Sequence, residues 1–261
     1  MPKALLASGA VLVILATGLV LLNHRDAGNA PPSAAKQASD VSFNHPTEPQ
    51  ADVTPILVNG LDEQYSSQTA EDWVTNADFV ADVTVTDAVA LPLGDTDRKR
   101  GEGSQGRTAY LRVNKIIWAT EKPKKNLPDN FTLAAWGWTF KDHDFDGKVP
   151  VVGGGGSRLE EGHRYIVGLV WEPSRCSEGD PMDPAHWSFI GTKGSIPFDS
   201  GVLGVGEFEG TVQTLKPPVG PSPEWQKTFR DSVLGKGLDG VRDALEQATP
   251  GKRRFLKPSP C

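Results

Sequence analysis

Cysteine is almost absent from this chain of 261 residues, which contains only Cys176 and Cys261. Two cysteines are too few for a zinc site of the cysteine-rich kind, which takes four ligands. In an oxidising compartment the two could instead form a disulfide that closes a loop of about 85 residues. The other interpretation is that Cys176 is an inert thiol, because no catalytic pattern surrounds it.

A basic face is also missing. The chain has 27 lysines and arginines against 33 aspartates and glutamates, a formal net charge of −6. A general nucleic-acid binder needs a positively charged surface, so this class of function is excluded. The one basic cluster, residues 252–254 with Lys257, lies in the C-terminal tail, which is either solvated or in contact with an anionic surface.

Familiar catalytic motifs are lacking as well. The sequence contains neither G-x-S-x-G nor H-E-x-x-H, the signatures of a nucleophile elbow and of a zinc-binding helix. Cys176 and His186 are a conceivable nucleophile and base, but nothing in their spacing is specific to catalysis. The glycine run 153–156 lacks the Lys-Ser/Thr that follows a phosphate-binding loop, so it indicates a surface connector.

One long hydrophobic run is present, at the N-terminus. Residues 4–22 contain no charged side chain, and as a helix they would span roughly 29 Å, the thickness of the hydrocarbon core of a bilayer. We expect an uncleaved transmembrane anchor, with its start in the cytoplasm and the rest of the chain outside. The alternative is a cleaved signal peptide and a secreted protein, since residues 28–30 offer small side chains for cleavage.

Composition divides the chain beyond the anchor, residues 1–22, into four parts. Residues 23–55 are rich in Ala, Pro, Ser and Asn and poor in large apolar side chains, which predicts a disordered spacer. Residues 56–215 form the predicted extracytoplasmic β domain. Residues 216–251 form helices that we expect to pack on it, and residues 252–261 form a basic tail.

Alternating apolar residues predict at least five antiparallel strands in the β domain. A short helix comes first, with Thr69 and Asp72 as its capping box. From Phe79 onward the apolar period becomes two, which is typical of a half-buried strand. Residues 165–171 are apolar on both faces and predict a central strand. Because no crossover helices separate the strands, we expect a mainly β fold, a barrel or a sandwich.

Two helices are predicted near the C-terminus. Ser222 and Pro223 form a helix start signal, and apolar residues then recur every four positions through Phe229 and Val233. A shorter helix follows around residues 241–248.

Three stretches, NADFVADVTVT, YLRVNKIIWAT and LEEGHRYIVGLVW, resemble in their order a layout of bacterial extracytoplasmic proteins with a netrin-like barrel. This is the OB-type fold that tissue inhibitors of metalloproteinases also use. The resemblance covers residues 69–171 and implies an OB-like barrel. Those inhibitors act through a cysteine-rich N-terminus. Because this chain has no cysteine before Cys176, the resemblance implies a fold and no activity.

Three aspartates alternate in the segment KDHDFDG, at Asp142, Asp144 and Asp146. Alternating carboxylates followed by glycine are the pattern of the D-x-D-x-D-G calcium loops. The twelfth position is Gly153 where an EF-hand has glutamate, and no helical pattern flanks the loop, so an EF-hand is excluded. Two interpretations stay open, a looser calcium site that recruits a nearby glutamate and a solvated acidic turn.

Trp136 and Trp138 lie on one face of a predicted strand beside this acidic loop. They either cover the core or, if exposed, suit a sugar or peptide ligand. We therefore expect a membrane-anchored extracytoplasmic binding module of the cell envelope, with a protein or carbohydrate ligand and no cofactor apart from calcium. An envelope hydrolase and a calcium-stabilised structural module are the alternatives.

Overall fold

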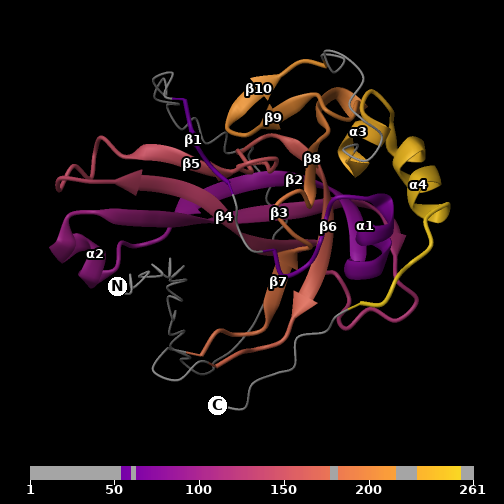
Figure 1. Ribbon diagram of the computed structural model, residues 1–261, viewed down its shortest axis with the longest axis horizontal. Helices are drawn as coiled ribbons and strands as arrows, with labels where there is room; N and C mark the ends of the chain where they lie inside the picture. The colour runs from indigo at the N-terminus through magenta and orange to yellow at the C-terminus, as the bar shows by residue number, and fades with distance from the viewer. Residues whose placement is uncertain (1–53, 60–62, 177–181, 216–227, 254–261) are drawn as a thin grey trace, which may run out of the picture.

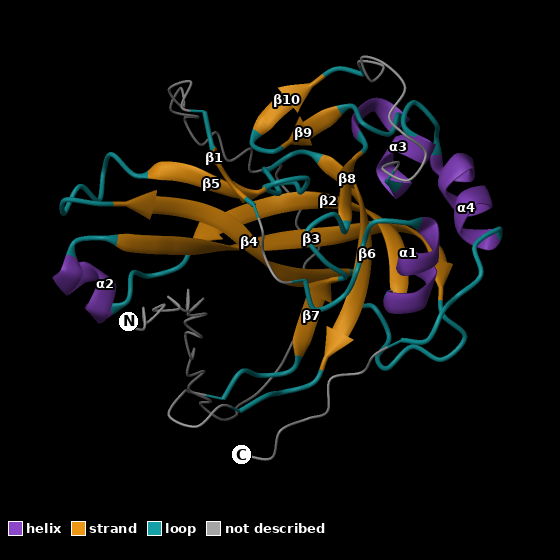
Figure 2. Ribbon diagram, viewed as in Figure 1, coloured by secondary structure: helices purple, strands orange, loops and turns teal. Residues whose placement is uncertain are grey.

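The computed structural model describes residues 54–59, 63–176, 182–215 and 228–253. This part of the chain is mainly β (Figure 2). The strands are β1 (Ile56–Val58), β2 (Phe79–Ala90), β3 (Gly103–Ala119), β4 (Asn130–Phe140), β5 (Val149–Gly153), β6 (Arg164–Glu172), β7 (His186–Phe189), β8 (Ser195–Pro197), β9 (Gly206–Phe208) and β10 (Thr211–Gln213). The helices are α1 (Ala70–Asn76), α2 (Asp95–Arg100), α3 (Phe229–Val233) and α4 (Leu238–Glu246), with a 3-10 turn, η1, at Asp199–Gly201.

The predicted anchor, nearly all of the spacer and most of the basic tail lie outside the described residues. Among the helices that are described, none combines the length and the apolar character needed to cross a bilayer.

A mixed sheet of eight strands forms the body of the molecule (Figure 1). Its order is β1-β5-β4-β3-β2-β6-β7, and β8 pairs with β6. Neighbours are antiparallel except β1 and β5, which are parallel. Within the described ranges the sheet stays open, with β1 and β7 as its ends, so the closed barrel expected from the sequence does not form. The pairing of β4 with β5 is weak. It spans two residue pairs and includes Pro150, a residue without a backbone N–H.

The long central strands curl the sheet. The β2–β3 pairing shifts register at three places, between Val80 and Ala81, between Asp82 and Val83, and between Val85 and Asp87. Each shift adds local twist, as β-bulges do. The sheet therefore wraps partly around one of its own faces.

Each face of the sheet carries its own core. The enclosed face buries apolar side chains of β2, β3, β4 and β6, among them Leu111 and Leu169. The opposite face carries Ile166 and Val170, which lie under α1, α3 and α4. β6 contributes to both cores, as its continuous apolar run predicts. Trp73 of α1 is fully buried against the ring of Phe229, with centroids 4.7 Å apart.

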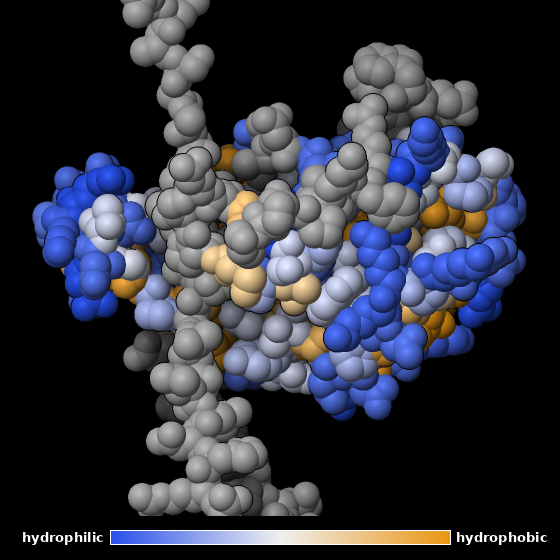
Figure 3. Space-filling model, turned by 90° about the horizontal axis from the view of Figure 1, so that it is seen from below, coloured by the Kyte–Doolittle hydropathy of each residue, from blue (hydrophilic) through white to orange (hydrophobic). Residues whose placement is uncertain are grey.

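Two elements differ from the sequence prediction. The helix that carries Phe229 begins after Thr228, which is extended and forms a capping box with Asp231. The predicted start at Ser222 is therefore wrong for this helix, because the nearer cap sets the boundary. Helix α2 was not predicted, since all six of its side chains are polar and none is buried. Figure 3 shows this end of the molecule covered by hydrophilic side chains.

Candidate functional site

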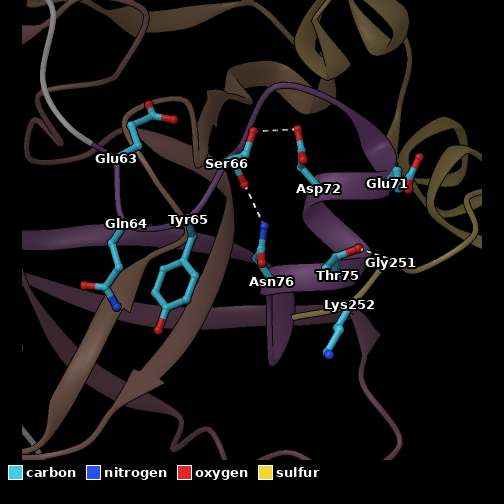
Figure 4. Close-up of a pocket in the computed structure, with 10 residues that line it drawn as sticks. All are labelled: Glu63, Gln64, Tyr65, Ser66, Glu71, Asp72, Thr75, Asn76, Gly251 and Lys252. Atoms are coloured by element: carbon cyan, nitrogen blue, oxygen red, sulfur yellow. Dashed lines mark hydrogen bonds between the residues drawn. The ribbon is translucent and has the colours of Figure 1, made fainter. Parts of the chain in front are cut away.

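A polar pocket of about 420 Å³ lies between three segments of the chain. Residues 63–66 form one side, helix α1 forms the opposite side, and residues 251–252 complete it at the C-terminal end. Figure 4 shows the side chains that line it. The first two segments are neighbours in sequence, whereas residues 251–252 come from the other end of the described chain and are brought to them by the fold.

The capping box of α1 fixes one wall. Thr69 Oγ1 accepts a hydrogen bond from the Asp72 backbone N–H at 3.1 Å, and the Thr69 N–H donates to Asp72 Oδ2 at 2.9 Å. The same carboxylate oxygen accepts from the Gln68 N–H at 3.0 Å and from Ser66 Oγ at 2.8 Å. All three of these hydrogen bonds to the carboxylate fall on Oδ2, and Oδ1 meets no donor among the described residues.

Asn76 lines the pocket and is only 8 % exposed. Its Nδ2 donates to the carbonyl oxygen of Ser66 at 3.0 Å, and Figure 4 shows the nitrogen turned toward that oxygen. This bond orients the amide, and its oxygen Oδ1, an acceptor, forms no hydrogen bond with any described residue.

The C-terminal segment is held against α1 by polar contacts. The Gly251 N–H donates to Thr75 Oγ1 at 2.6 Å. Arg253 NH1 lies 2.7 Å from Oδ1 of Asp78, a side chain that is fully buried at the start of β2. The second oxygen of Asp78 accepts from the Trp171 N–H at 2.8 Å. These bonds place Gly251 and Lys252 in the wall of the pocket.

The side of the pocket formed by residues 63–66 carries Glu63 and Tyr65. Glu63 Oε1 accepts hydrogen bonds from the N–H and the hydroxyl of Thr192, the first at 2.9 Å. Tyr65 is 3 % exposed, and its hydroxyl meets none of the described polar atoms in hydrogen-bond geometry. Burial, and then the negative charge of Glu172, raise the pKa of the Tyr65 hydroxyl, so it stays protonated at neutral pH.

The charge of the pocket is unbalanced. Three carboxylates line it, Glu63, Glu71 and Asp72, against a single described cation, Lys252. Glu71 and Lys252 form no ion pair with any described residue. The site therefore offers mainly acceptors and a net negative charge.

The tryptophans predicted as a ligand surface lie elsewhere, and both are half-buried. Trp136 packs so closely on Gly153 that a Cβ at that glycine would lie 2.8 Å from the indole ring. The ring of Trp138 lies 4.2 Å from Lys148 Nζ and 5.5 Å from the Arg107 guanidinium. Both rings therefore have close neighbours within the protein, and their role as a ligand surface stays a prediction.

Next to Trp138 the structure holds a buried ionic network that sequence reasoning missed. Arg107 NH1 and Arg158 Nε contact the two oxygens of Glu160 at 3.0 and 2.7 Å. Glu207 accepts from the hydroxyl of Tyr165 at 2.7 Å. Burial lowers the pKa of Arg107, whereas burial and then Glu207 raise the pKa of Tyr165. The two arginines also donate to backbone carbonyls of β4, of β5 and of residue 158 itself. Bonded in this way, they join these strands to one another, which is a structural role.

The acidic loop after β4 is exposed at Asp142, Asp144 and Asp146. Asp144 Oδ1 accepts from the Gly147 N–H at 2.7 Å, the bond of a local turn. In the part of the chain that the structure covers, no group of three or more His, Cys, Asp or Glu side chains is arranged to hold a metal ion. The structure therefore does not bring the three carboxylates together.

No free cysteine occurs among the described residues, and Cys176 is disulfide-bonded. Cys261, its predicted partner, lies outside them, so the pairing stays a prediction. Two of the histidines make polar contacts. His163 Nδ1 lies 2.5 Å from Asp199 Oδ2, and His186 Nδ1 lies 2.8 Å from the carbonyl oxygen of Pro184. Within the described ranges no serine or threonine hydroxyl is hydrogen-bonded to His163.

Most of the pocket could not be predicted. Asp72 was identified from the sequence, but only as a helix cap. The other side chains carry no motif, because the site exists only once segments separated by more than a hundred residues meet. In comparisons with known proteins, no family model, no curated protein and no solved structure matches this chain.

Proposed function

We propose that this chain is a binding module that takes a small polar ligand in the pocket between α1 and the C-terminal segment. Residues 4–22 tether it to the membrane, with the folded domain on the extracytoplasmic side of the cell envelope. The pocket volume of about 420 Å³ falls in the range of ligand sites, about 300–1,000 Å³.

The observation that carries the proposal is the amide of Asn76. This lining side chain is almost fully buried, its nitrogen is fixed to Ser66, and its oxygen is an acceptor that bonds to none of the described residues. A buried acceptor that is already oriented can bind a ligand donor with little loss of side-chain entropy. Asp72 supports this interpretation, because one of its oxygens is held by three donors while the other bonds to no residue that the structure describes.

A direct test is a binding screen of the full chain in lipid nanodiscs. The panel consists of monosaccharides, amino sugars, amino acids and diamines, and the readout is the change in melting temperature followed by calorimetric titration. We expect at least one member to bind with a Kd below about 1 mM. The variant Asn76→Ala should weaken that binding by about tenfold, the worth of one hydrogen bond to a well-placed acceptor.

The matched control is Asn114→Ala. This asparagine also makes side-chain hydrogen bonds, to Asp82 and Thr84, but it lies outside the pocket. Its removal should leave the Kd unchanged. If every compound fails to bind, or if Asn76→Ala binds as tightly as the original chain while its circular dichroism is unaltered, the proposed site is wrong.

A further inference from the structure

We propose that the loop between β5 and β6, residues 154–163, is an oxyanion-binding site, which Glu207 fills and from which an external carboxylate or phosphate displaces it. Glu207 belongs to the β9–β10 hairpin, residues 206–213, which we call the strap. This site shares no lining residue with the pocket described above, so the inference is independent of the proposed function. It follows from the donors that meet Glu207, from the backbone of the loop and from the attachment of the strap.

Four donors hold the buried carboxylate of Glu207, and three of them are backbone N–H groups. Oε1 accepts from the N–H of Gly210 at 2.6 Å and from the N–H of Arg158 at 3.2 Å. Oε2 accepts from the Leu159 N–H at 3.2 Å and from the Tyr165 hydroxyl at 2.7 Å. These donors recognise oxygen and negative charge, not the side chain that carries them, so they suit any carboxylate or phosphate.

Residues 158–160 direct successive N–H groups to this site. The Glu160 N–H donates to the Tyr165 oxygen at 3.0 Å, and the same hydroxyl donates to Glu207. Leu159, between its two neighbours, has a φ of +65° and is fully buried. A left-handed residue in a run of N–H groups forms a nest, a backbone geometry that binds anions. The strain of this conformation in a residue with a β-carbon is typical of ligand-binding segments.

The same loop has more donors than the acceptors of the described chain satisfy. Ser157 Oγ and Arg158 Nη2 are buried, and neither meets a polar partner in hydrogen-bond geometry within the described ranges. The Gly155 N–H donates to a second carboxylate of the strap, Oε1 of Glu209, at 2.6 Å. Because a buried donor without an acceptor is costly, a further oxygen acceptor at this loop would be favoured.

The strap is attached to the body of the molecule separately from the large sheet. Among the strands that the structure describes, β9 and β10 pair only with each other (Figure 1). The outer strand is open to solvent, and Val212 is 72 % exposed. The chain enters the strap through Gly204 and Gly206, both at positive φ, and glycines are suited to absorb a change of backbone direction. The strap can therefore swing away while the sheet stays intact.

An external oxyanion must compete with Glu207, which is tethered beside the site. The apparent Kd of such a ligand rises by the factor that the closed strap imposes. The buried Phe208, whose ring centre lies 3.8 Å from the guanidinium carbon of Arg230, also favours the closed strap. We therefore expect weak binding to the natural chain and tighter binding once the Glu207 side chain is removed.

The first experiment measures the emptied site in Glu207→Ala, as the full chain in nanodiscs. Sodium acetate and sodium phosphate are titrated separately, with NaCl at equal ionic strength as the reference, and the readouts are melting temperature and calorimetry. We expect one of the two to bind with a Kd below about 10 mM, and about tenfold to thirtyfold more tightly than it binds the natural chain. Acetate and phosphate distinguish a planar carboxylate from a tetrahedral phosphate as the preferred ligand. The control Glu161→Ala, which removes an exposed carboxylate of the same loop, should bind as the natural chain does.

The second experiment follows amide hydrogen exchange of the natural chain by NMR, in about 0.5 M of the preferred oxyanion against NaCl at equal ionic strength. Displacement of Glu207 should speed exchange of the Gly210 N–H about tenfold, because its acceptor leaves with the strap. The N–H groups of Arg158 and Leu159 should stay protected, because the new ligand accepts from them. A strap that merely unfolds would lose the protection of all three together, which would contradict the proposal.

Three results would overturn the inference. A folded Glu207→Ala that binds neither acetate nor phosphate shows that the loop is not an oxyanion site. Equal affinities of this variant and the natural chain show that the ligand binds elsewhere. Unaltered exchange at Gly210 shows that the strap does not yield. If Glu207→Ala fails to fold, Glu207→Gln, which keeps the length of the side chain and removes its charge, takes its place and should still bind the oxyanion more tightly than the natural chain does.

Discussion

The ion pair between Arg253 and Asp78 holds the C-terminal wall of the pocket, and its removal should be costly. The side chain of Asp78 is 1 % exposed and that of Arg253 is 11 % exposed, with 2.7 Å between NH1 and Oδ1. Loss of one member of a buried pair leaves an uncompensated charge, which costs about 3–5 kcal/mol. We therefore expect Arg253→Met to lower the free energy of unfolding by about this amount, a fall in Tm of about 6–20 °C for a domain of this size.

The assay is urea unfolding followed by tryptophan fluorescence, with a double-mutant cycle. Asp78→Asn combined with Arg253→Met should be more stable than Arg253→Met alone, because the double variant no longer buries an unpaired charge. The cycle also separates the pair from the other contacts of Arg253.

The control is an exposed pair of similar geometry. Arg242 and Asp239 lie 2.9 Å apart on α4, and the Asp239 side chain is 87 % exposed. Arg242→Met should cost less than about 1 kcal/mol. If Arg253→Met costs no more than this control, the C-terminal segment is not anchored by Asp78, and the account of the pocket wall is refuted.

Three further predictions concern the body of the protein. Burial by itself would raise the pKa of the Glu160 carboxyl, but two buried guanidinium groups hold it below its ordinary value. The stability that it contributes is therefore present above the unfolded pKa of about 4.3 and is lost as the pH falls through the folded value, so Glu160→Gln should flatten the decline in urea stability between about pH 5 and pH 3. Gly137→Ala would place a Cβ 1.8 Å from a backbone oxygen of β3 and should cost more than about 3 kcal/mol. Gly162→Ala, at a φ of +82° in open space, should cost about 1–2 kcal/mol, and equal melting temperatures of the two variants would contradict this reasoning. Peptide mapping without reductant should find Cys176 joined to Cys261, with reduction costing about 2–4 kcal/mol, whereas a different partner for Cys176 would refute the pairing.

Local patterns predicted the parts of the fold that depend on local physics. The capping box at Thr69 and Asp72 and the strand from Phe79 are read directly from a few adjacent residues, and both occur in the structure. The doubly buried strand β6 was also predicted, because a run that is apolar on both faces must be covered on both sides.

Features that depend on distant partners were not predictable. The three-residue strand β1 becomes a strand only because it pairs with β5. That the two edge strands of the sheet stay apart could not be predicted for a related reason. Local alternation of apolar residues specifies strands, but it does not specify which strand edges pair. The role of Asn76 could not be predicted either, because nothing in the neighbouring sequence shows that its amide will contact the backbone of Ser66.

The measurement that tests the central claim most directly is an amide NMR titration of the full chain in nanodiscs with each class of the panel in turn, monosaccharides, amino sugars, amino acids and diamines. The account predicts that the largest chemical-shift changes fall in residues 63–66, in helix α1 and in residues 251–252. Changes that cluster around Trp136 and Trp138, or an unaltered spectrum at concentrations of about 10 mM, well above the weakest Kd expected, would contradict it.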